Sequence, residues 1–379
     1  MNSLAPADPE RTGQLVALIL ADAVRRGASD VHVEPTHRTL EIRFRLDGVL
    51  QPAASLSREL GTNVVARLKV LAELLTYRVD IPQEGRIQDS HALYGADMRV
   101  STFPTVHGEK AVVRLFDTAG RVLDLEQLGL SPDVEGALRT MLRERSGAVF
   151  LTGPSGSGKT TTIYACLRHL VRDSAGGRHI VTIEDPVEQV IEGVSQSQAR
   201  PGTDFDFARG LRSLLRQDPE VIMIGEVRDA QTASIAIEAA LTGHLVFTTL
   251  HAGSACGVIG RLLDMGIEPY LLTSGLKGIL NQRLVRRCCS LCRGSGAVTP
   301  AERCERCAGT GYHGRLLLAE LLTLTAPLRQ AILARSDTSA LESAVNEPGR
   351  CTIWTAADEA IADGRTTSEE IERVLGPRR

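Results

Sequence analysis

The eight residues GPSGSGKT, from Gly153 to Thr160, have the composition and spacing of a phosphate-binding loop. They follow the apolar run AVFLTG and precede the helical pattern TTIYACLRHL, so a chance glycine-rich turn is the weaker alternative. Glycines let backbone amides point at a phosphate, and the helix adds the positive end of its dipole. We expect Lys159 to reach the β- and γ-phosphates of ATP and Thr160 to bind Mg²⁺. The expected nucleotide contacts are Gly153, Pro154, Ser155, Gly156, Ser157, Gly158, Lys159, Thr160 and Thr161.

Two later apolar runs end in carboxylates. EVIMIGEVRD ends in Glu226, and HIVTIEDPVE ends in Glu184 and Asp185. Parallel strands present their carboxyl ends at one edge of a sheet, so we expect these groups beside the γ-phosphate. A carboxylate there can hold Mg²⁺ through water or orient the attacking water, although a helix cap or a solvated turn is the alternative. Gly225 stands where many such strands carry an aspartate, which argues against direct metal ligation by this strand.

Two histidines stand at the ends of another apolar run, HLVFTTLH. A lone histidine is more often a structural hydrogen bonder than a catalytic group. The polar end of this run would meet the phosphates, which makes His251 a candidate site residue. His244, at the other end, is a candidate with less support from its position.

Five of the eight cysteines lie between Cys288 and Cys307. Two C-x-x-C pairs, Cys289 with Cys292 and Cys304 with Cys307, are separated by eleven residues. Four thiolates at this spacing predict a tetrahedral zinc site, and four protein ligands leave no open position, so we expect a structural role. Cys288 is a spare thiol or exchanges with Cys289 as the ligand.

Composition bounds the remaining possibilities. The chain has 379 residues, 43% hydrophobic, with a net charge of −3 and 3% aromatic residues, so we expect two or three domains and no direct nucleic-acid partner. No apolar run is long enough to cross a bilayer, and the N-terminus lacks the pattern of a signal peptide. We therefore expect a cytoplasmic protein that contacts the membrane only through partners.

The predicted secondary structure that positions these residues differs between the first and second parts of the chain. Residues 1–118 read as a small α+β domain, in which TLEIRFRLDGVL alternates as a half-buried strand that turns at Asp47-Gly48. Residues 119–134 read as a linker. From 135 to 379, apolar strands alternate with helices, as in a buried parallel sheet, and the tail from about residue 315 reads as helical with a break at Gly364 and another at Gly349.

Taken in order, these motifs resemble those of the bacterial type II secretion and type IV pilus assembly ATPases. The matching stretches are ASDVHVEP, RFRLDG, MRVSTFPTVHGEKAVVRL, GPSGSGKTTT, TIEDPVE, GEVRD, TGHLVFTTLH and QRLVRR, within residues 14–375. The resemblance implies a RecA-like P-loop NTPase domain behind a PAS-like domain, assembled as a homo-hexamer. It also implies an ATP-driven motor that acts on an inner-membrane platform protein to add pilin-like subunits, with a location peripheral to the inner membrane.

The resemblance also implies roles for single residues. Glu226 becomes the water activator, Glu184 falls in an acidic box, and His244 and His251 fall in a histidine box. Arg99 and Arg114 match first-domain arginines that bind the phosphates; without the family, pairing with Asp97 or Glu109 would be the default.

The insertion at residues 287–314 ends in TGYHGR, as in assembly motors, whereas retraction motors generally lack it. Longer members carry an N-terminal docking domain, and because the first domain already begins near residue 14 we expect that arm to be missing here.

Two other functions compete with this interpretation. A RecA-like nucleic-acid motor shares the core but needs basic and aromatic surfaces that the composition does not favour. A zinc-bearing scaffold that uses nucleotide only as a switch would not need the full set of Lys159, Thr160 and Glu226.

Overall fold

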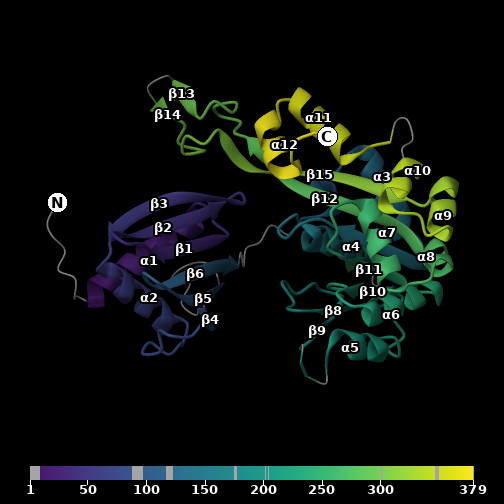
Figure 1. The fold of residues 1–379 in the computed structure, drawn as a ribbon, viewed down its shortest axis with the longest axis horizontal. Helices are drawn as coiled ribbons and strands as arrows, with labels where there is room; N and C mark the ends of the chain where they lie inside the picture. The colour runs from purple at the N-terminus through teal and green to yellow at the C-terminus, as the bar shows by residue number, and fades with distance from the viewer. Residues whose placement is uncertain are drawn as a thin grey trace. The chain divides into compact units, whose positions relative to one another are not determined.

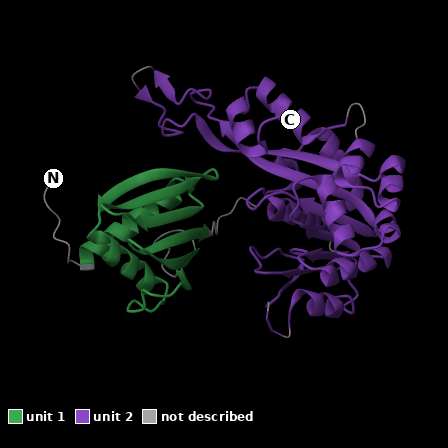
Figure 2. Cartoon of the chain, viewed as in Figure 1, with its two compact units in different colours: residues 1–122 green, residues 123–379 purple. Residues whose placement is uncertain are grey.

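The chain divides into two compact units, residues 1–122 and residues 123–379 (Figure 2). The computed structural model describes residues 9–87, 97–116, 123–174, 177–200, 202–203, 205–299, 302–345 and 350–378. Each unit has its own buried apolar core, as expected for a chain of this length.

Unit 1 is a six-stranded antiparallel sheet with two helices, in the strand order β3-β2-β1-β6-β5-β4 (Figure 1). One face of the sheet packs its apolar side chains with the helices, and Leu40, Ile42 and Phe44 alternate inward as predicted. The predicted turn is also confirmed: Asp47 and Gly48 have φ values of 48° and 82°, which suit a two-residue hairpin. The elements are α1 (Pro9–Arg25), β1 (Asp30–Pro35), β2 (Thr39–Leu46), β3 (Val49–Ser57), α2 (Leu60–Leu71), β4 (Gln83–Ile87), β5 (Asp97–Thr105) and β6 (Gly108–Phe116).

Unit 2 is built on a seven-stranded mixed sheet with the order β15-β12-β7-β11-β10-β8-β9. All neighbouring pairs are parallel except β12 with β15. Every residue of the central strands is buried, which confirms the predicted parallel strands. The strands are β7 (Gly147–Thr152), β8 (Ile180–Glu184), β9 (Ser195–Gln198), β10 (Val221–Ile224), β11 (Leu245–Thr249), β12 (Leu276–Cys288) and β15 (Tyr312–Thr323), with a separate ribbon of β13 (Ala297–Thr299) and β14 (Glu302–Arg303).

Helices cover both faces of this sheet and make it a three-layer α/β unit (Figure 1). Helices α5 to α10 pack on one face, whereas η1, α3 and α4 pack on the other. Their bounds are η1 (Leu125–Leu128), α3 (Pro132–Leu142), α4 (Lys159–Asp173), α5 (Phe207–Leu214), α6 (Ala230–Leu241), α7 (Ala255–Asp264), α8 (Pro269–Gly275), α9 (Ala326–Leu333), α10 (Thr338–Ala344), α11 (Ile353–Ala362) and α12 (Ser368–Leu375).

The helical reading of the tail from residue 315 is wrong for its first part. Residues 312–323 form strand β15, which pairs with β12 from Gly278 opposite Thr323 to Cys288 opposite Tyr312. The leucine-rich run LLLAELL has high helix propensity, but pairing with a distant strand overrides it. Helices begin at Ala326, and Gly364 follows the end of α11; Gly349 lies outside the described residues.

Part of the stretch that the sequence assigns to a linker belongs to the fold of unit 2. Leu125, Leu128 and Leu130 are buried in the same cluster as α3 and α4. Residues 117–122 lie outside the described part of the chain.

Among the described residues, no helix combines the length and apolar character that crossing a bilayer requires.

Candidate functional site

The predicted phosphate loop connects β7 to α4. Gly153, Gly156 and Gly158 have φ values of 144°, 75° and 88°, in the region that favours glycine. Space also requires glycine, because a Cβ on Gly153 would lie 2.4 Å from the carbonyl oxygen of Gln282 in β12. Among the described residues, the buried hydroxyl of Ser157 has no hydrogen-bond partner, which fits a loop that donates to a bound anion.

Lys159, the first residue of α4, places its ammonium inside this loop. Its Nζ donates to the carbonyl oxygens of Gly153 at 2.8 Å and Pro154 at 3.0 Å. Burial and the charge of Arg283 lower the pKa of Lys159, while the charge of Glu226 opposes this shift. The Lys159 ammonium therefore interacts electrostatically with both the Glu226 carboxylate and the Arg283 guanidinium of β12.

Glu226 lies two residues beyond β10 and meets His251 beyond β11. Its Oε1 lies 3.3 Å from Nε2 of His251, and its Oε2 accepts from Nε of Arg228 at 2.7 Å. A hydrogen bond between the ends of the two strands supports the contact of Glu226 with His251, since the Thr249 hydroxyl donates to the Gly225 carbonyl at 2.8 Å. The carboxylate is 21% exposed, so it keeps access to water. The structure thus brings Glu226 and His251 together at the carboxyl edge of the sheet.

Glu184, the last residue of β8, is only 2% exposed. Its carboxylate accepts hydrogen bonds from the hydroxyls of Tyr164 and Thr182 and from Gln196 Nε2. Burial and the hydrogen bond to Glu184 raise the pKa of Tyr164. A carboxylate held by three donors is fixed in place, and one of those donors lies on α4, so Glu184 braces the helix that follows the phosphate loop.

His244 does not join this group within the chain. It immediately precedes β11, at the amino end of the strand, and its Nδ1 lies 3.0 Å from the carbonyl oxygen of Ala239. The five residues of β11 separate it from the edge that carries His251, a distance of roughly 15 Å. Its placement matches the structural alternative for a lone histidine.

Arg99 and Arg114 lie in unit 1, directly opposite each other on β5 and β6. Arg99 pairs with Glu84, and Arg114 Nε lies 3.1 Å from Asp30 Oδ1. Asp30 is 5% exposed and also lies 3.4 Å from Arg45. Like charges opposite each other in a sheet are unfavourable, so Asp30 offsets the repulsion.

The four predicted zinc ligands converge. The Sγ atoms of Cys289, Cys292, Cys304 and Cys307 all lie within 4.8 Å of one another, with separations of 3.8 Å for the first and third and 3.7 Å for the second and fourth. A tetrahedron with metal–sulfur bonds of about 2.3 Å has sulfur–sulfur edges of about 3.8 Å. The cluster therefore fits zinc, and it contains Cys289 rather than Cys288.

The two C-x-x-C repeats fold alike. In each repeat, the first, second and fourth residues after the second cysteine take positive φ. A backbone amide also donates to sulfur in each, from Gly296 to Cys292 and from Gly311 to Cys307, both at 3.3 Å. The glycines let the turns approach, since a Cβ on Gly311 would lie 2.3 Å from the carbonyl oxygen of Gly294. The glycine spacing in the sequence thus follows from contact between the two turns.

A buried carboxylate on α12 fastens the base of this cysteine arm. Glu370 is 1% exposed and accepts from the backbone amide and guanidinium of Arg286 and from the guanidinium of Arg373. The Arg286 guanidinium also lies over the ring of Tyr312, 4.1 Å from its centroid. Both ends of the arm, on β12 and β15, are thereby tied to α12.

Several residues of the site were missed by the sequence reasoning. Tyr164 and Gln196 hold Glu184, Arg228 holds Glu226, and Arg283 lies beside Gly153 of the phosphate loop. Only Arg228 had a sequence signal, its place in GEVRD two residues after the carboxylate. The other partners come from elements far apart in the chain.

Three comparisons relate this chain to known proteins. The family model of the Type II/IV secretion system proteins matches residues 7–373. The Type II secretion system ATPase E of Vibrio cholerae is 41% identical over 382 residues, covering 95% of this chain and 75% of that protein. Among solved structures, the pilus retraction motor PilT with bound ADP is 25% identical, covers 94% of this chain and 98% of its own, and has a TM-score of 0.56. The Legionella pneumophila ATPase DotB is 23% identical, covers 99% and 97%, and shares the fold with a TM-score of 0.71.

Proposed function

Since the chain belongs to the type II/IV secretion system protein family, we propose that it is an ATP-hydrolysing motor that powers assembly of pilin-like subunits in type II secretion or type IV pilus biogenesis. The observation that carries the proposal is that Glu226 meets His251 at the carboxyl edge of the parallel sheet, the edge at which the loop bearing Lys159 follows β7. A phosphate loop binds the nucleotide there, and a partly exposed carboxylate faces the same edge.

In this mechanism the loop amides and Lys159 hold the β- and γ-phosphates, and the Thr160 hydroxyl holds Mg²⁺. Mg²⁺ held there would supply positive charge to the phosphate oxygens. Glu226 accepts a proton from, or orients, the attacking water, and His251 and Arg228 hold that carboxylate in place. Glu184 acts on the site through Tyr164 and α4.

The architecture that we propose follows the family. Residues 135–379, with the segment 123–134 that packs on them, form a RecA-like ATPase domain, and residues 1–118 form a PAS-like domain. Six copies form a ring, in which Arg99 and Arg114 bind phosphates and His244 belongs to the histidine box. The ring acts on an inner-membrane platform protein and is peripheral to the inner membrane through that partner.

We also propose that the tetracysteine insertion at 287–314 binds one zinc ion as a structural centre. The sulfur spacing and the donor set support zinc, and four thiolates leave no position for a substrate. The zinc then organises the arm between β12 and β15 and contributes a contact surface for neighbouring proteins.

Steady-state ATPase assays on the purified oligomer test the proposal. We expect Lys159→Ala to lose nucleotide binding, and Glu226→Gln to bind Mg-ATP while its kcat falls by about 10²–10⁴-fold. Glu268→Gln, which removes an exposed carboxylate paired with Arg335, serves as the matched control. A Glu226→Gln variant with the wild-type rate would remove the assigned role, and strong stimulation by single-stranded DNA would favour a nucleic-acid motor instead.

A further inference from the structure

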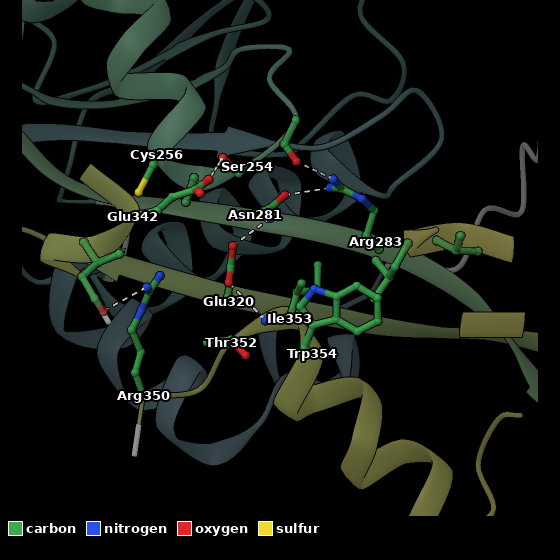
Figure 3. Close-up of a pocket in the computed structure, with 15 residues that line it drawn as sticks. Ser254, Cys256, Asn281, Arg283, Glu320, Glu342, Arg350, Thr352, Ile353 and Trp354 are labelled. Carbon is green, nitrogen blue, oxygen red and sulfur yellow. Dashed lines mark hydrogen bonds between the residues drawn. The ribbon is translucent and has the colours of Figure 1, made fainter. Parts of the chain in front are cut away.

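Arg283 of β12 joins its own strand to the segment that follows β11 (Figure 3). Its Nη1 donates to Asn281 Oδ1 at 2.7 Å and to the Gln282 carbonyl at 2.9 Å, and its Nη2 donates to the Gly253 carbonyl at 2.8 Å. Gly253 lies two residues after His251 in the segment that follows β11. One guanidinium thus holds the histidine-bearing segment against β12.

The same guanidinium lies close to the phosphate loop. A Cβ built on Gly153 would lie 3.3 Å from Arg283 Nη1 and 2.4 Å from the Gln282 carbonyl oxygen. The Gln282 side chain in turn donates to Thr162 Oγ1 of α4 at 2.8 Å. A displacement of β12 at these residues would therefore move the loop and the start of α4 together.

A chain of hydrogen bonds continues from Arg283 to the C-terminal helices. Asn281 Nδ2 donates to Glu320 Oε1 at 2.9 Å, and the Ile353 amide donates to Glu320 Oε2 at 3.1 Å (Figure 3). A guanidinium only donates and a carboxylate only accepts, which fixes the orientation of the Asn281 amide between them. Ile353 opens α11, so Glu320 satisfies one of the free amides of that helix.

Hydrogen bonds rather than apolar packing set the positions of Arg283, Asn281 and Glu320. Asn281 is 2% exposed and Glu320 is 9% exposed, and burying such groups is favourable only when their bonds are satisfied. A cavity of about 420 Å³ borders them, lined also by residues of α7, α10, α11 and α12. Without close packing on that side, loss of one bond lets the neighbouring groups move.

We propose that Arg283 is a positioning residue of the nucleotide site, and that Asn281 and Glu320 tie its position to the start of α11. The inference rests on the proposed ATPase function. The position of α11 thereby affects how the segment bearing His251 lies beside Glu226, and the C-terminal helices become part of the support of the site.

Three conservative variants of the 379-residue chain test the proposal. Arg283→Lys keeps the charge but loses the fixed fork of donors. Asn281→Asp sets a carboxylate against Glu320, and Glu320→Gln cannot accept from both partners. Arg335→Lys and Glu268→Gln, from an exposed pair, are the matched controls. We expect kcat to fall about tenfold or more in the three variants, with KM for ATP within about twofold and the oligomer intact, because small misplacements cost mainly turnover.

Hydrogen exchange gives a readout that does not depend on turnover. The Ala252 amide donates to Thr152 Oγ1 at 3.0 Å, within the segment that Arg283 holds. We expect residues 251–254 to exchange faster in Glu320→Gln than in wild type, although the substitution lies in another strand. Unchanged exchange there in all three variants overturns the proposal, even if the wild-type chain proves not to hydrolyse ATP. A fall in melting temperature with unchanged kcat and unchanged local exchange also overturns it, since that pattern marks a purely structural role.

Discussion

Replacing Glu370 by Gln is the perturbation whose size the structure predicts best. The carboxylate is buried at the base of the cysteine arm between Arg286 and Arg373. Burial alone would raise the pKa of Glu370, but the hydrogen bonds from Arg373 and Arg286 outweigh it and lower the pKa from 4.5 to about 2. The ionised form of Glu370 is therefore more stable in the folded state than in the unfolded state.

The sign and size follow from linkage. A depressed folded pKa contributes stability that is complete above the unfolded value of 4.5 and is lost as the pH falls through about 2. At 1.36 kcal/mol per pKa unit, the contribution is about 3 kcal/mol at pH 7 and roughly half of that at pH 3. Glu370→Gln removes this dependence and leaves two guanidinium groups without their carboxylate.

Urea denaturation at a series of pH values measures the effect. Trp354, the only tryptophan, lies in α11 and reports unfolding of this region by its fluorescence. We expect the stability difference between wild type and Glu370→Gln to shrink steadily between pH 5 and pH 2. Glu372→Gln, at an exposed position two residues further along α12, is the matched control and should leave the midpoint unchanged. A difference below about 1 kcal/mol at pH 7, or one that does not change with pH, would refute the reasoning.

Three further outcomes are expected. Elemental analysis should find one zinc per chain in wild type and in Cys288→Ser but none in Cys304→Ser; the reverse pattern would contradict the ligand assignment. Lys69→Met should destabilise unit 1 by about 3–5 kcal/mol, because it leaves the buried Glu109 carboxylate unpaired. Adding Glu109→Gln to the same chain should recover part of this loss, as measured by urea denaturation followed by circular dichroism. Asp30→Asn should speed hydrogen exchange in β1 and β6, since Arg45 and Arg114 lose the carboxylate that lies between them. Exchange equal to that of the wild type would show that these ion pairs do not stabilise the two strands.

The phosphate loop and the cysteine pairs could be predicted because their chemistry is local. The glycines at 153, 156 and 158 need positive φ within one turn, and each C-x-x-C pair supplies two thiolates from one turn. Central strands could be predicted as well, since residues buried on both faces leave continuous apolar runs. The convergence of Glu226 with His251 followed from the rule that parallel strands end at one edge.

Strand β15 could not be predicted, because its leucine-rich pattern favours a helix until β12 pairs with it. The residues that hold Glu184 could not be predicted either, because their contacts also form only in the folded chain. Tyr164 and Gln196 meet at Glu184 from α4 and β9, and no spacing along the chain shows that they will.

By itself, therefore, the sequence predicted the phosphate loop, the four-cysteine cluster and the family, because each depends on residue types at short fixed spacings. Only the tertiary structure decided that Tyr164 and Gln196 hold Glu184. It also decided that His244 lies at the far end of β11 from His251 and that Arg283 joins the nucleotide site to α11. The physical reason is that the contacts of Glu184, Arg283 and Glu320 join residues 12 to 39 positions apart, where packing and hydrogen-bond satisfaction, rather than local spacing, select the partners.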